Sequence, residues 1–391
     1  MVGINVFREK LQQLSALALR RSLVPLESAT GATIQYGGRE VILLSSNDYL
    51  GLSNHPEVVR AAITATERYG VGSGGSRLVS GTLPPHTHLE TTLARFKGTE
   101  AALLFGAGYI ANLGIIPTLI GSGGLILADR LCHASVIDAC RLSQADFRVF
   151  HHGDCHHVES LLRRRTTDRP TLIITEGVFS MDGDLAPLPD LVSLAERYGA
   201  TVYVDDAHGT GIMGATGRGT VEHFGLERRI PFHMGTLSKA LGSHGAFLVG
   251  PNDLVQYIIN VTRPFIFATA LPPAVAAASS AALTVIDQEP ERRARLWSNR
   301  QRFLDGLKNL GCRLTPTDSP ILPVLIGDPV AASTFAERLL ALGVYATAIR
   351  PPTVPDGTSR IRFTVTSEHT TAQIDEALNA LRIAIRETGL V

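Results

Sequence analysis

Amine chemistry in this chain has few possible carriers. Only four of the 36 basic side chains are lysines, namely Lys10, Lys97, Lys239 and Lys308, and the others are arginines. Arginine stays charged at neutral pH and forms no Schiff base. Lys10 and Lys308 fall on polar faces of expected helices, and Lys97 ends another, where its charge complements the helix dipole. Lys239 therefore remains as the candidate amine nucleophile.

The surroundings of Lys239 suit that chemistry. It lies in the stretch Gly235-Thr-Leu-Ser-Lys-Ala-Leu-Gly242, directly after an expected buried strand. Hydroxyl groups flank the lysine and little charge lies nearby in the sequence. A poorly solvated ammonium loses its proton more easily, and imine formation requires the neutral amine.

A second polar group ends a neighbouring strand. The apolar run from Thr201 leads into Asp205 and Asp206, and His208 follows three residues after Asp205. A buried acid is unfavourable without a cation, so a ligand-borne cation such as a protonated pyridine nitrogen is a natural partner. A metal held by Asp205, Asp206 and His208 is one alternative, and a solvated strand end is the other.

Two glycine-rich turns suggest different roles. Gly106-Ala-Gly-Tyr109 follows an expected strand and precedes an expected helix, so its amides are placed to bind a phosphate, unless it is a plain turn. Tyr109 or His133 is a candidate to offer a flat face to an aromatic ring.

The second glycine-rich turn, Gly70–Gly75, formally contains the dinucleotide fingerprint, but it follows a helix, which argues against a nicotinamide site. We interpret Gly70–Arg77 as backbone that a ligand or partner can approach closely.

The elements that must position these residues indicate an α/β fold. Short apolar runs without alternation are separated by helical segments, which predicts mostly parallel strands buried on both faces. The strands are expected at 101–105, 125–128, 147–150, 172–175, 201–204, 232–234 and 246–249. The residues that follow such strands gather at one edge of the sheet, where ligands bind.

The chain is expected to divide into three parts. A helix and arm form residues 1–46, a large α/β domain forms 47–285, and a small α+β domain forms 286–391. In the last part, strands are expected at 321–326 and 360–365, and helices at 330–342 and 371–386.

Composition excludes several classes of function. The net charge is zero, so neither nucleic acid nor a membrane is an expected partner. Four scattered cysteines argue against a disulfide framework and favour the cytoplasm. The cluster of four histidines and Cys155 within His151–His157 invites a zinc interpretation, but no convincing second ligand pair is evident. We expect no metal, and a solvated loop there instead.

Taken together, these motifs resemble the α-oxoamine synthases, enzymes of the aminotransferase fold type that use pyridoxal 5′-phosphate. These enzymes condense an amino acid with an acyl thioester and lose carbon dioxide. The resemblance covers nearly the whole chain and implies the type I fold of pyridoxal-phosphate transferases. The matching stretches are Ser45–Gly51, Gly72–Arg77, Asp129–Ser135, Thr175–Gly183, Val204–Gly211 and Thr236–Lys239.

Within that family, one stretch points to the amino acid and the acyl donor. Ala348-Ile-Arg-Pro-Pro-Thr-Val-Pro355, with Gly357 and Arg360-Ile-Arg362, is similar to the branch that joins L-alanine to a pimeloyl thioester in biotin biosynthesis. A glycine-using sister synthase is the alternative within the family. A non-catalytic regulator that binds pyridoxal phosphate or a metal is the alternative outside it.

The resemblance also implies roles for individual residues. Lys239 would attach the cofactor and remove the α-proton, and Asp205 would keep the pyridine nitrogen protonated. His133 would stack on the ring. The remaining cofactor contacts would come from Gly108, Tyr109 and Thr236 at the phosphate, and from Ser180 and His208 at the phenolic oxygen.

The resemblance also implies which residues contact the substrates and how the chains assemble. Arg21 and Thr353 would meet the acyl donor, Arg350 is a candidate carboxylate partner, and His133 would also face the substrate. Members of the family are homodimers with shared active sites. Asn47 and the Gly72–Arg77 loop are the candidates to lie near that junction.

Overall fold

The computed structural model describes residues 4–165 and 169–390. Contacts between residues divide the chain into two compact units. The larger unit holds Leu50–Ser180 and Asp184–Arg293, and the smaller unit holds the residues up to 49, 181–183 and those from 294 on. The three-part division predicted from the sequence remains a prediction.

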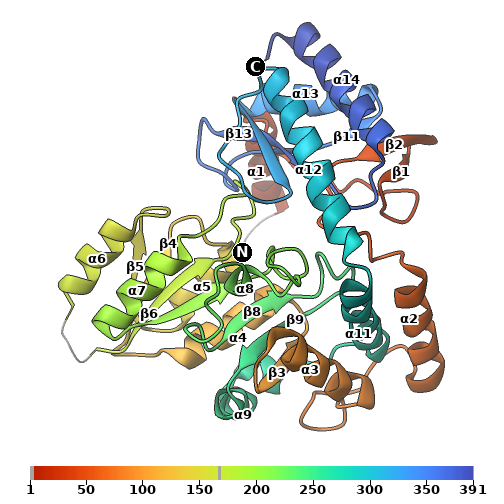
Figure 1. The fold of residues 1–391 in the computed structure, drawn as a ribbon. Helices are drawn as coiled ribbons and strands as arrows, with labels where there is room; N and C mark the ends of the chain where they lie inside the picture. The colour runs from red at the N-terminus through yellow and green to blue at the C-terminus, as the bar shows by residue number, and fades with distance from the viewer. Residues whose placement is uncertain (1–3, 166–168, 391) are drawn as a thin grey trace. The chain divides into compact units, whose positions relative to one another are not determined.

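A seven-stranded sheet organises the larger unit (Figure 1). Its strand order is β3-β9-β8-β7-β6-β4-β5, and β9 runs antiparallel to both of its neighbours, whereas the other pairs are parallel. The α/β class with a mostly parallel sheet is confirmed. The strands are β3 (Ala101–Phe105), β4 (Leu125–Asp129), β5 (Asp146–Phe150), β6 (Thr171–Glu176), β7 (Thr201–Asp205), β8 (His233–Thr236) and β9 (Ala246–Gly250).

Helices cover both faces of this sheet, as the unbroken apolar runs predicted. Ile126 and Ala128 of β4 join the core beneath one set of helices, and Leu125 and Leu127 join the core on the other face. The first set comprises α4 (Gly108–Leu119), α5 (Ala134–Leu142), α9 (Asn252–Val261) and α10 (Arg263–Ile266); the second comprises α6 (Cys155–Arg163), α7 (Leu188–Tyr198) and α8 (Thr220–His223).

Three further helices complete the larger unit. They are α2 (Pro56–Tyr69), α3 (Pro84–Lys97) and α11 (Pro273–Gln288), and α2 and α11 lie side by side (Figure 1). The sequence pattern predicts Asn54 as the residue that opens α2, but His55 caps the helix by accepting the Glu57 amide on its ring nitrogen. The pattern also predicts one long helical stretch from Pro273 to about Leu310, but the Glu289–Pro290 segment divides it into two helices.

The smaller unit has two three-stranded sheets. One contains β1 (Thr33–Tyr36), β2 (Arg39–Leu43) and β11 (Val344–Tyr345), and the other contains β10 (Ile321–Gly327), β12 (Thr347–Ile349) and β13 (Ser359–Thr364). Its helices are α1 (Ile4–Ala16), most of α12 (Glu291–Asn309), α13 (Pro329–Ala341) and α14 (Thr371–Thr388). The sequence pattern predicts a first helix from Phe7 to Leu23, but α1 ends at Ala16, and none of its residues is buried. None of the described helices combines the length and apolar composition required to span a bilayer.

Candidate active site

The carboxyl ends of the central strands enclose a cavity of about 170 Å³ in the larger unit. All eight residues that the sequence suggested for cofactor binding line it. They are separated in sequence by up to 131 positions and meet because parallel strands end at one edge of the sheet. The complete lining is Gly108, Tyr109, Asn112, His133, Ser135, Glu176, Ser180, Asp205, Ala207, His208, Met234, Thr236, Ser238 and Lys239.

Asp205 supplies a buried carboxylate at the end of β7, where only 5% of the residue is exposed. Its Oδ2 accepts a 2.8 Å hydrogen bond from Asn112 Nδ2, and its Oδ1 accepts one from the Ala207 amide. Asn112 also donates to Ser135 Oγ and accepts from Tyr203 Oη. Sequence reasoning missed Asn112. The signal was a polar residue inside the otherwise apolar segment that forms α4.

His133 begins α5 as its N-cap residue. Its Nδ1 accepts from the Ser135 amide, so the neutral ring carries its proton on Nε2. Burial lowers the pKa of His133, and the positive charge of Lys239 also lowers it, against the opposing effect of Asp205. The ring therefore favours its neutral form, which suits contact with a flat aromatic group.

Glu176 is a second buried acid in the cavity, and the sequence indicated it only as a polar residue at a strand end, with no role assigned. It lies opposite Asp205 in the register of β6 and β7 and is 3% exposed. Its Oε1 accepts the His133 amide at 2.5 Å. Burial and the Asp205 carboxylate raise the pKa of Glu176 to about 8, although Lys239 and backbone amides oppose this. The signal in the sequence was its place at the end of an apolar strand.

The opposite wall combines hydroxyl groups with the start of a helix. Thr236 Oγ1 donates to the Gly245 carbonyl and lies 2.8 Å from Ser238 Oγ. The first residue of α4 is Gly108, and the extended Ala107 precedes it. A Cβ atom at Gly108 would meet no atom within 4 Å, so the space beside this residue is open. The Tyr109 hydroxyl bonds Asp138.

This donor set fits pyridoxal 5′-phosphate. A buried carboxylate suits a protonated ring nitrogen, and amides at a helix N-terminus with nearby hydroxyls suit a phosphate. Lys239, half-buried in the same cavity, offers an amine for an aldehyde.

The expected substrate residues lie elsewhere. Arg21, Arg350 and Thr353 line a cavity of about 570 Å³ in the smaller unit. Arg21 Nη2 donates to the Pro351 carbonyl at 3.2 Å and lies 3.5 Å from Thr353 Oγ1, and Arg350 donates to the Ala18 carbonyl. His133, the fourth, lines the smaller cavity described above.

The Arg360-Ile-Arg362 motif has two different environments in the smaller unit. Arg360 is ion-paired with Asp182 at 2.6 Å. Arg362 is 6% exposed and donates to Asn47 Oδ1 at 3.1 Å. The structure therefore joins Asn47 to a buried arginine, a contact that the sequence did not predict.

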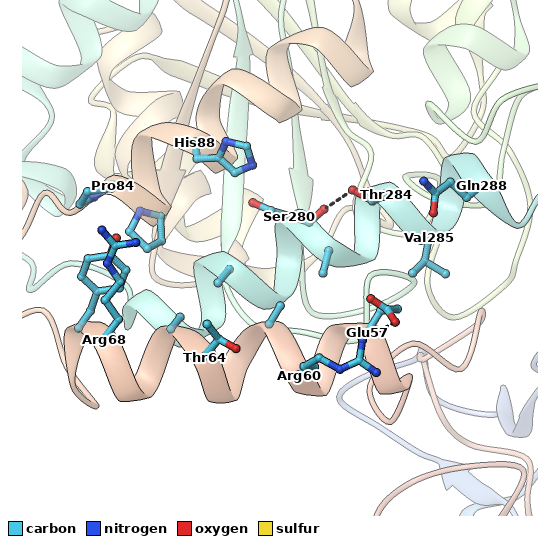
Figure 2. Close-up of a pocket in the computed structure, with 16 residues that line it drawn as sticks. Glu57, Arg60, Thr64, Arg68, Pro84, His88, Ser280, Thr284, Val285 and Gln288 are labelled. Atoms are coloured by element: carbon cyan, nitrogen blue, oxygen red, sulfur yellow. Dashed lines mark hydrogen bonds and ion pairs between the residues drawn. The ribbon is translucent and has the colours of Figure 1, made fainter.

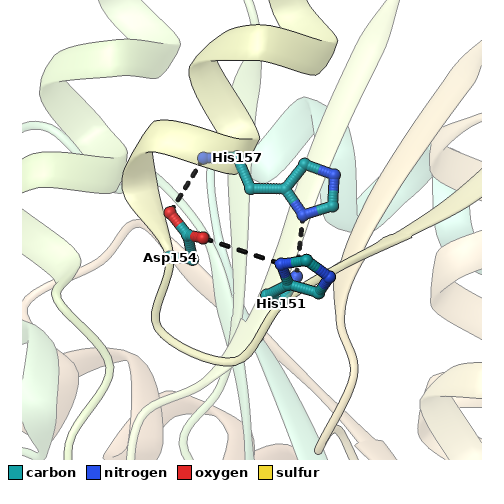
Figure 3. Close-up of side chains that lie close together, drawn as sticks. All are labelled: His151, Asp154 and His157. Atoms are coloured by element: carbon teal, nitrogen blue, oxygen red, sulfur yellow. Dashed lines mark hydrogen bonds and ion pairs between the residues drawn. The ribbon is translucent and has the colours of Figure 1, made fainter.

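Two features carry none of the expected site residues. A cavity of about 670 Å³ lies between α2, α3 and α11, with Arg60, Arg68 and His88 in its lining (Figure 2). In the histidine-rich stretch, His151, Asp154 and His157 come together (Figure 3). There the Asp154 carboxylate caps α6, and His157 Nδ1 accepts the His151 amide.

The prediction that Lys97 ends a helix is confirmed, but the helix dipole is an incomplete explanation of its charge. The side chain is 1% exposed and lies 3.2 Å from Asp206 Oδ2. Both oxygens of the Asp206 carboxylate accept hydrogen bonds, from Lys97, Thr210 and Thr220, which argues against the metal arrangement considered with Asp205 and His208. Lys10 and Lys308 are exposed, as predicted.

Comparison with known proteins decides the family. The sequence profile of the family described as aminotransferase class I and II matches residues 39–381. The chain belongs to the class I and II aminotransferase family. It is 49% identical to 8-amino-7-oxononanoate synthase of Geobacter sulfurreducens over 385 residues, which cover 98% of each protein. It is 45% identical to 8-amino-7-oxononanoate synthase 1 of Bacillus subtilis, over 94% of this chain and 93% of that protein.

Solved structures agree with this assignment. A serine palmitoyltransferase from S. paucimobilis with bound PLP-myriocin superposes with a TM-score of 0.94 at 36% identity, covering 98% of both chains. The 8-amino-7-oxononanoate synthase of Francisella tularensis gives a TM-score of 0.77 at 28% identity, covering 89% of this chain and 98% of that one. Within its family, this aminotransferase-fold chain belongs to the α-oxoamine synthases, and the type I fold predicted from the motifs is confirmed.

Proposed function

We propose that the chain condenses L-alanine with a pimeloyl thioester, giving 8-amino-7-oxononanoate, carbon dioxide and free thiol, with pyridoxal 5′-phosphate as cofactor. The observation that carries this proposal is the match over 98% of the chain to a relative of that name at 49% identity. The reaction belongs to biotin biosynthesis. The carboxylate, amides, hydroxyls and lysine that line the cavity of about 170 Å³ in the larger unit support the choice of cofactor.

The residues that would hold the cofactor follow from their chemistry. Asp205, fixed by Asn112, would pair with the ring nitrogen, and His133 would lie against the ring face. The amides of Gly108 and Tyr109 with the Thr236 hydroxyl would bind the phosphate. Ser180 and His208 would bond the phenolic oxygen. When bound, the cofactor supplies an electron sink for negative charge at the α-carbon of the amino acid.

The chain itself would move the protons. Lys239 Nζ would take the α-proton of alanine and return a proton to the product. Overall, a bond forms between the α-carbon and the thioester carbonyl, and the carbon–sulfur and carbon–carboxylate bonds break. The neutral His133 ring would exclude water from one side of the reacting centre.

The cavity of about 570 Å³ in the smaller unit is the proposed place of the acyl donor. Arg21 and Arg350 supply two guanidinium groups, which suit an anionic donor, and Thr353 supplies a hydroxyl. The donor carries its thioester on coenzyme A or on a carrier protein, and turnover measured with each would identify which is used.

Assembly and location remain expectations. We propose a homodimer in which Asn47 and the Gly72–Arg77 loop lie near the junction, and light scattering of the purified chain tests it. The four cysteines are free, and the cytoplasmic location expected from their number stays a prediction.

The substrate proposal has a direct test. Purified protein is mixed with pimeloyl-coenzyme A and either L-alanine or glycine, and free thiol is measured. We expect release with alanine and little with glycine, and Lys239→Ala should release none. Acetyl-coenzyme A is the comparison donor, and more thiol release from glycine with this short donor would favour the sister synthase instead.

A further inference from the structure

A buried ion pair lies one residue from the strand end that carries Asp205. Lys97 is the last residue of α3, and its side chain and that of Asp206 are 1% and 0% exposed. Lys97 Nζ lies 3.2 Å from Asp206 Oδ2, 2.8 Å from Thr210 Oγ1 and 2.5 Å from the Arg218 carbonyl. Its three hydrogens therefore each have an acceptor, as a buried ammonium requires.

The Asp206 carboxylate is equally well satisfied. Its Oδ1 accepts from the Thr220 amide at 3.1 Å and from Thr220 Oγ1 at 2.6 Å. Its Oδ2 accepts from Lys97 and from Thr210 Oγ1 at 3.2 Å. The carboxylate thus joins the end of α3, the end of β7 and the start of α8.

Glycines make room for this carboxylate. A Cβ atom at Gly177, Gly209 or Gly219 would lie 2.6, 2.1 or 1.8 Å from an Asp206 oxygen. These glycines come from three different segments of the chain. Substitution of any of them would displace the acid, so the backbone is shaped around the ion pair.

The same residue fixes a turn that reaches the cofactor cavity. The Asp206 amide donates to the Met234 carbonyl at 2.8 Å, and its carbonyl accepts from the amides of Gly209 and Thr210. Asp205 and His208 belong to this turn and line the cavity. A shift of Asp206 would therefore move both.

We propose that Lys97 and Asp206 are positioning residues that hold Asp205 and His208 against the cofactor. The inference rests on the proposed function, because it assumes that pyridoxal phosphate occupies the cavity. A buried ion pair contributes little stability compared with apolar residues of the same volume, but it fixes one arrangement of its neighbours. The other groups facing the pair are Glu222, whose charge interacts with Lys97, and His233, which burial keeps neutral.

The test compares Lys97→Met, Asp206→Asn and the double variant Lys97→Met/Asp206→Asn. Four quantities are measured: the dissociation constant of pyridoxal phosphate, the ¹⁵N chemical shift of its ring nitrogen in labelled cofactor, deuterium exchange of the 204–211 backbone in the apoprotein, and the melting temperature. Lys308→Met is the matched control, because Lys308 is an exposed lysine at the end of α12.

We expect each single variant to weaken cofactor binding about tenfold, to shift the ring-nitrogen signal toward the unprotonated form, and to speed exchange of the turn. The double variant should melt at a higher temperature than either single variant, because no unpaired charge remains. It should still bind pyridoxal phosphate as weakly as the single variants do. Lys308→Met should match the wild type in all four. A purely structural pair predicts the opposite: a lower melting temperature with wild-type affinity and ring-nitrogen shift, which would overturn the proposal.

Two further variants keep the test decisive. If Lys97→Met does not fold, Thr210→Val removes one hydroxyl link and retains both charges, and a smaller change in the same direction is expected; no change would contradict the proposal. Asp205→Asn reports on the proposed function. If wild type binds no cofactor, the function fails; if Asp205→Asn alone changes the ring-nitrogen shift, only the positioning role fails.

Discussion

His152 should make the stability of the protein depend on pH. Its ring bridges two carboxylates, with Nδ1 3.0 Å from Asp129 Oδ1 and Nε2 2.8 Å from Asp184 Oδ2. Both ring nitrogens can donate only when the imidazole is protonated. Burial lowers the pKa of His152, but the two carboxylates outweigh it and raise the pKa to about 10.

The sign of the effect follows from linkage. A pKa raised by folding adds stability at pH values below the unfolded value, about 6.5, and that stability is lost as the pH rises through the folded value. A rise to about 10 corresponds to at most about 4 kcal/mol at pH 7. Because 27% of the His152 side chain is exposed, solvent screening reduces this to about 2 kcal/mol.

The variant that tests this is His152→Gln, which fills similar space and cannot become charged. At pH 7 we expect the apoprotein to lose about 2 kcal/mol, or about 2–3 °C in melting temperature for a chain of this length. The difference from wild type should shrink toward zero by about pH 10. His88→Gln, at an exposed histidine, should show no such dependence. A deficit for His152→Gln that is equal at pH 7 and pH 10 would refute the reasoning.

Three other outcomes are expected. Asp205→Asn should keep the cofactor and lose most exchange of the α-proton of alanine, measured by NMR in deuterium oxide; near-normal exchange would count against its role at the ring nitrogen. Arg350→Met should raise the KM for the acyl thioester about tenfold with little change in kcat, in steady-state assays, and an unchanged KM would remove Arg350 from the donor site. Cys132, whose thiol pKa burial raises well above its usual value, should resist iodoacetamide in the folded protein at neutral pH, and rapid labelling detected by mass spectrometry would contradict that.

Residues of the cofactor cavity could be predicted because the end of a buried strand is recognisable from the local sequence. A parallel sheet brings the residues after each apolar run to one edge, so Asp205, His208 and Thr236 could be grouped without knowing the strand order. The reversed direction of β9 was not predictable, because a run buried on both faces looks the same in either direction.

Contacts between residues far apart in the chain could not be predicted from the sequence. Lys97 lies 109 positions before Asp206, and no pattern in the sequence around Lys97 predicts that it has a buried ion-pair partner. Asn112 was missed and Glu176 was given no role for the same reason, because their importance comes from Asp205 and His133, which tertiary packing brings beside them. Lysine elimination selected Lys239, but its explanation of Lys97 as a helix-end charge did not include the buried ion pair with Asp206.

The most direct test of the account follows the carboxyl carbon of alanine. Purified protein with pyridoxal phosphate is given pimeloyl-coenzyme A and L-alanine labelled with ¹³C at the carboxyl group. We predict labelled carbon dioxide, one equivalent of thiol and an unlabelled product with the mass of 8-amino-7-oxononanoate, all absent with Lys239→Ala. Formation of labelled pyruvate without thiol release, the outcome of simple amino transfer, would contradict the account.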